Sequence, residues 1–60
     1  MAQFAEFVLA ETQVHVVLNL ENVVEVLPDN ESRTIIVLHG NTQRVVAGSF
    51  EEVKRTLGLP

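Results

Sequence analysis

The sequence predicts an α+β domain, a small antiparallel sheet of about four to five strands with one C-terminal helix. Short apolar segments rich in valine and isoleucine recur along the chain, separated by turn-forming residues. The connections between them are short, which favours antiparallel over parallel pairing. Only the last segment has helical spacing. With 60 residues, the chain is expected to form a single domain, residues 1–60.

Two strands are predicted in the N-terminal third. In residues 1–10, Phe7 and Leu9 share one face of an extended strand, with Phe4, Glu6 and Val8 on the other. Residues 11–13 form a turn. The second strand has a clear apolar face at alternating positions, consisting of Val14, Val16, Leu18 and Leu20. Residues 20–22 are expected to interrupt regular pairing.

A third strand is predicted over residues 23–27. We expect Pro28 to end it, because proline has no N–H to donate to a neighbouring strand. Residues 28–32 have the polar composition of a loop.

The central unit is a hairpin. An unbroken, mostly β-branched run predicts a strand covered on both faces; it consists of Ile35, Ile36, Val37 and Leu38. Residues 39–41 supply the turn, since Gly40 and Asn41 readily adopt positive φ. The chain returns through residues 42–47, with its apolar end over the core.

The helix is the best-defined prediction. Gly48 ends the preceding strand, and Ser49 with Glu52 three residues later fits a capping box. Gly58 suits the C-terminal cap. The apolar face of the helix consists of Phe50, Val53 and Leu57.

Composition predicts self-association. Hydrophobic residues make up 47% of the chain, and there is no cysteine to form a disulfide. One face of the sheet packs on the helix, while the other keeps an apolar patch of the kind that marks interfaces. In the alternative, the N-terminal strand folds over that face and closes a small barrel. The residues expected in the oligomer interface or the core are Ile35, Ile36, Val37, Leu38, Val16 and Leu18.

No residue pattern indicates catalysis, a cofactor or a metal site. His15 and His39 lack the spacing of metal ligands, and Ser49 already caps the helix. The N-terminus lacks a positively charged region and contains Glu6, unlike a secretory signal. No apolar stretch is long enough to cross a membrane. We therefore expect a cytoplasmic protein.

Two functions remain. The first is a non-enzymatic, self-associating module that acts as a regulatory or adaptor protein, as a homodimer or larger oligomer with possible protein partners. The second is a nucleic-acid-binding regulator that uses a basic patch around Arg33 and Arg44. The net charge of −4 weighs against the second, although all four cations lie in residues 31–60.

Several segments together form a recognisable pattern: Leu18-Asn19-Leu20, Val23-Val24, Thr34-Ile35-Ile36-Val37-Leu38 with Gly40, Val45-Val46 and Ser49-Phe50-Glu51-Glu52-Val53. With these segments, the chain resembles short flagellar-operon proteins of the FlbD type over roughly residues 7–57. Its strand–turn–strand–helix order is also similar to part of the LytTR DNA-binding domain. The resemblance implies a small cytoplasmic accessory or regulatory protein without catalytic residues.

Overall fold

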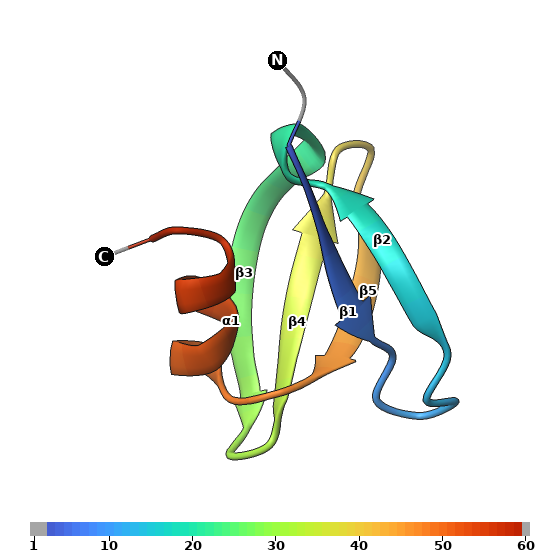
Figure 1. The fold of residues 1–60 in the computed structure, drawn as a ribbon, viewed down its shortest axis with the longest axis vertical. Helices are drawn as coiled ribbons and strands as arrows, with labels where there is room; N and C mark the ends of the chain where they lie inside the picture. The colour runs from blue at the N-terminus through green and yellow to red at the C-terminus, as the bar shows by residue number, and fades with distance from the viewer. Residues whose placement is uncertain (1–2, 60) are drawn as a thin grey trace.

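A computed structural model describes residues 3–59 and confirms the α+β class. The strands form two antiparallel sheets, β1-β2 and β3-β4-β5, and the helix α1 follows the last strand (Figure 1). The elements are β1 (Phe4–Val8), β2 (His15–Asn19), the 3-10 helix η1 (Leu20–Asn22), β3 (Val23–Asn30), β4 (Arg33–Leu38), β5 (Thr42–Ala47) and α1 (Phe50–Thr56).

The prediction of one sheet with four to five strands is wrong, because the five strands are divided between two layers. The β1-β2 hairpin lies across the three-stranded sheet rather than beside it (Figure 1). Its connection to that sheet is a single antiparallel bridge between Leu9 and Val46, with the Ala10 N–H donating to the Val45 carbonyl at 2.9 Å. The η1 turn after β2 redirects the chain, so β3 begins in the other layer.

The prediction that Pro28 ends the third strand is also wrong. β3 continues to Asn30, and Pro28 pairs in register with Thr34. β3 is the edge strand of its sheet, where a missing N–H is tolerated because no further strand needs it. Register shifts on either side, at Val24 and Asp29, bend this edge.

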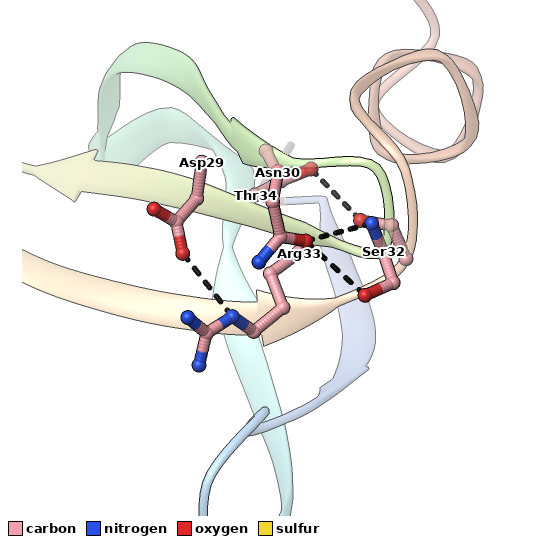
Figure 2. A network of polar contacts seen from close by, with 6 residues as sticks. Asp29, Asn30, Ser32, Arg33 and Thr34 are labelled. Carbon is pink, nitrogen blue, oxygen red and sulfur yellow. Dashed lines mark hydrogen bonds and ion pairs between the residues drawn. The ribbon is translucent and has the colours of Figure 1, made fainter.

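The two turns around β4 explain its ends. In the β3-β4 turn, the Asn30 Oδ1 accepts from the Ser32 backbone N–H at 2.8 Å and from its hydroxyl at 3.1 Å (Figure 2). In the β4-β5 turn, Gly40 and Asn41 have φ of 85° and 65°, as their residue types predict.

The predicted capping box is confirmed. The Ser49 hydroxyl accepts from the Glu52 N–H at 3.2 Å, while the Glu52 carboxylate accepts from the Ser49 N–H at 2.9 Å. At the other end, Gly58 adopts φ of 80° and donates to the Arg55 carbonyl, and Leu59 donates to the Lys54 carbonyl. These two bonds form a Schellman motif, so the seven-residue helix is capped at both ends.

One core joins the two layers and the helix. Its buried members come from five different elements and form a single cluster: Phe7, Leu18, Ile36, Val46 and Val53. Because Ile36 and Val46 lie on the same face of the β3-β4-β5 sheet, the hairpin and α1 both pack against that one face. The Thr34 side chain, also fully buried there, donates to the Gly48 carbonyl at 2.9 Å.

Candidate interaction surface

Among residues 3–59, the β1-β2 hairpin and α1 pack on the face of the β3-β4-β5 sheet that carries Ile36 and Val46. We call the opposite face the open face. Antiparallel register places Leu27, Ile35 and Val45 side by side across the three strands. The next row along consists of Glu25, Val37 and Gln43. Side chains alternate between faces along a strand, so these rows point away from Ile36 and Val46.

Burial agrees with this assignment. Ile35, Val37 and Val45 are half-buried by their neighbours in the sheet, and Leu27 is 36% exposed. None of the four belongs to the core cluster or to the residues that pack against it. The open face therefore presents a continuous apolar stripe to its surroundings.

One end of the open face is polar. The Arg33 Nε lies 3.2 Å from the Asp29 Oδ2, next to the β3-β4 turn (Figure 2). The Nε atom is buried but its N–H is not aligned with an acceptor, so the contact is an ion pair without a well-formed hydrogen bond. Both side chains remain partly exposed, which leaves the guanidinium available to a second carboxylate.

The residues predicted for the interface or the core lie in two different environments. Ile36 and Leu18 are buried in the core, and Val16 and Leu38 pack against it. Ile35 and Val37 instead lie on the open face. Among the predicted residues of the helix face, Val53 is buried and Leu57 packs against the core. Phe50 is half-buried, with the Lys54 Nζ 5.0 Å above its ring.

Arg33 and Arg44 do not form a common patch. Arg33 pairs in register with Ala47, and Arg44 with Ile36, so the two side chains leave opposite faces of the sheet. Arg33 contacts Asp29, whereas the Arg44 Nη1 donates to the carbonyl of its neighbour Gln43.

An apolar groove between α1 and the start of β3 was not predicted from the sequence. It encloses about 330 Å³, with the charged side chains of Glu25 and Lys54 beside it. Its apolar walls are formed by Leu20, Val23, Val24, Val26, Phe50, Leu57 and Leu59. Leu59 beyond the helix cap was the one available signal, since a hydrophobic contact commonly accompanies this motif.

Residues 3–59 contain no group of three or more His, Asp or Glu side chains that could hold a metal ion. The longest helix in this range has seven residues, too few to cross a bilayer. Comparisons with family models, with curated proteins and with solved structures found no match for this chain.

Proposed function

We propose that this chain is a non-enzymatic module that self-associates through the open face and serves as a regulatory or adaptor protein in the cytoplasm. The observation that carries this proposal is the position of the covering elements. The β1-β2 hairpin and α1 both pack on the inner face of the sheet, and none of Leu27, Ile35 and Val45 belongs to the core that they form. The hairpin meets the stripe only at its edge, where the Ala10 N–H donates to the Val45 carbonyl. A second copy supplies the missing cover.

Charge supports a second copy as the occupant. Arg33 lies at one end of the apolar stripe, and Glu25 lies toward the other end on the neighbouring strand. A two-fold axis in the interface, perpendicular to the strands, brings the Arg33 end of one copy toward the Glu25 end of the other. Opposite charges then meet at both ends while apolar rows meet in the middle, so the face is complementary to itself.

The size of the face indicates a small, transient contact rather than an obligate interface. Three strands about 4.8 Å apart and about six residues long cover roughly 15 by 20 Å. A contact of that size buries less than the roughly 800 Å² per partner of a standard interface. We therefore expect a reversible dimer, a property suited to a regulated subunit rather than to an obligate dimer.

Ile35→Asp tests the proposal. A carboxylate at the centre of the stripe must be fully desolvated when two faces meet, whereas in the monomer this position is only partly buried. We expect the variant to stay folded by circular dichroism and to have a lower mass than the wild type at the same concentration in sedimentation velocity. The matched control is Val14→Asp, because Val14 is 53% exposed and lies off the open face.

Equal association by the Ile35→Asp variant and the wild type would contradict the proposal, as would a wild-type chain that stays monomeric up to millimolar concentration. The resemblance to flagellar-operon accessory proteins remains a prediction, and the reversible dimer is compatible with it.

A further inference from the structure

The free edge of β2 carries a second unpartnered feature. The Leu9 N–H donates to the Val14 carbonyl at 2.9 Å, and the Leu20 N–H donates to the Gln3 carbonyl at 2.8 Å. With the continuous register between β1 and β2, these bonds place every second residue of β2 in hydrogen-bonded pairs with β1. The backbone groups of His15, Val17 and Asn19 consequently point away from β1, along an open edge.

The β2 edge lacks the features that protect the β3 edge. The edge strand β3 contains Pro28, has two register shifts and packs against α1. β2 pairs with β1 without a register shift and contains neither proline nor lysine. The side chain of Val17, whose backbone groups point away from β1, is 64% exposed. Regular, apolar, unprotected edges are templates for the addition of another strand.

The edge is complementary to itself in one register. When two β2 strands run antiparallel with Val17 opposite Val17, His15 of one copy faces Asn19 of the other. All three outward residues then lie in hydrogen-bonded pairs, which gives about six backbone hydrogen bonds. Moving the strands by two residues loses one of the three pairs. On the inner side, Val16 comes opposite Leu18 of the second copy, which continues the apolar core side of the hairpin.

We propose that β2 pairs with β2 of a second copy, centred on Val17, to form a continuous four-stranded sheet from two hairpins. This contact goes beyond the open-face dimer, since it uses a different surface and main-chain hydrogen bonds. A chain with two self-complementary surfaces forms assemblies larger than a dimer. The open face and the β2 edge each contribute one two-fold contact.

The test is site-specific disulfide formation, which is unambiguous because the chain has no cysteine of its own. Val17→Cys puts two thiols in one hydrogen-bonded pair, where Cα atoms are about 5.5 Å apart and a disulfide can close. The control is His15→Cys, an equally exposed edge position. In the proposed register, position 15 of one copy lies four residues along the strand from position 15 of the other copy. This separation of about 13 Å is too far for a disulfide.

Mild oxidation of the full chain is expected to give a covalent dimer for Val17→Cys and to leave His15→Cys monomeric. Equal yields from the two variants, or no dimer from Val17→Cys, would overturn the proposed pairing. A non-covalent version compares Val17→Lys with Val24→Lys. The two valines are 64% and 63% exposed on the two different edges. Only Val17→Lys is expected to lower the mass of the assembly.

The two proposals fail separately. Val17→Cys should still form its disulfide in the Ile35→Asp background, because the edge contact does not need the open face. If Val17→Cys forms its disulfide but Ile35→Asp has the same mass as the wild type, the edge contact stands and the open-face dimer is ruled out. An effect of Ile35→Asp without the disulfide would do the reverse.

Discussion

The two faces of the β3-β4-β5 sheet differ in cover although they are built from the same residue types. Ile36 and Val46 on the inner face are completely buried by the β1-β2 hairpin and α1. Ile35 and Val45 on the open face are only partly buried and do not belong to the core cluster. Consecutive isoleucines of one strand therefore have different roles. Ile36 stabilises the monomer, while Ile35 is free to stabilise a contact with another copy.

The largest expected effect comes from truncating the inner isoleucine. Ile36→Ala leaves a cavity in a small core and should lower the free energy of unfolding by about 2–5 kcal/mol. Ile35→Ala, measured at a concentration where the chain is monomeric, should cost less than half as much, since its side chain is already partly in water. Urea denaturation followed by circular dichroism measures both. Equal losses would remove the distinction between the two faces.

A smaller effect is expected from the buried hydroxyl on the inner face. Thr34→Val removes the donor to the Gly48 carbonyl and leaves that acceptor without its bond, at a cost of about 1–3 kcal/mol. The control is Thr42→Val, because Thr42 is exposed and lies in the same sheet. The expected result is a lower melting temperature for Thr34→Val alone. An unchanged melting temperature for Thr34→Val would show that this hydrogen bond does not hold the start of α1 against the sheet.

The smallest expected effect concerns the capping carboxylate of α1, the helix that packs on the inner face. Hydrogen bonds from the Ser49 backbone N–H, and then the Ser49 side chain, lower the pKa of Glu52 from its usual value of 4.5. The ionised form is therefore favoured in the folded state. Its contribution to stability is present above the unfolded pKa and is lost as the pH falls through the lowered folded pKa.

Comparing the pH dependence of unfolding for Glu52→Gln and Glu51→Gln tests this contribution. Below about pH 4.5, the stability of Glu52→Gln should decline less steeply than that of the wild type. Glu51→Gln should retain it, because Glu51 contacts Lys54 rather than the capping box. Identical pH profiles for the two variants would show that the capping carboxylate adds nothing measurable.

Local chemistry predicted much of this fold from the sequence. The Ser49–Glu52 box, the Gly40-Asn41 turn and the interruption after β2 depend on neighbouring residues, and all three are present. Pro28 was misinterpreted because its effect depends on strand order, a long-range property. On an edge it does not end a strand.

The division into two sheets was beyond local prediction. Whether the N-terminal hairpin continues a sheet or crosses over it depends on contacts between Phe7, Leu18 and Ile36, which are far apart in sequence. For the same reason, the run from Ile35 to Leu38 indicated a need for cover without showing which side chains receive it. The separation of Arg33 from Arg44 likewise depends on the β4-β5 register, which places them on opposite faces.

We propose that a second copy covers the open face, and isotope-filtered NOE spectroscopy detects contacts between two copies without any substitution. Labelled and unlabelled chains are mixed at about millimolar concentration, because a small interface is expected to associate weakly. We predict intermolecular NOEs from the methyl groups of Ile35, Val37 and Leu27, and none from the buried methyls of Ile36. A spectrum without intermolecular NOEs from the open-face methyl groups at that concentration would contradict the account.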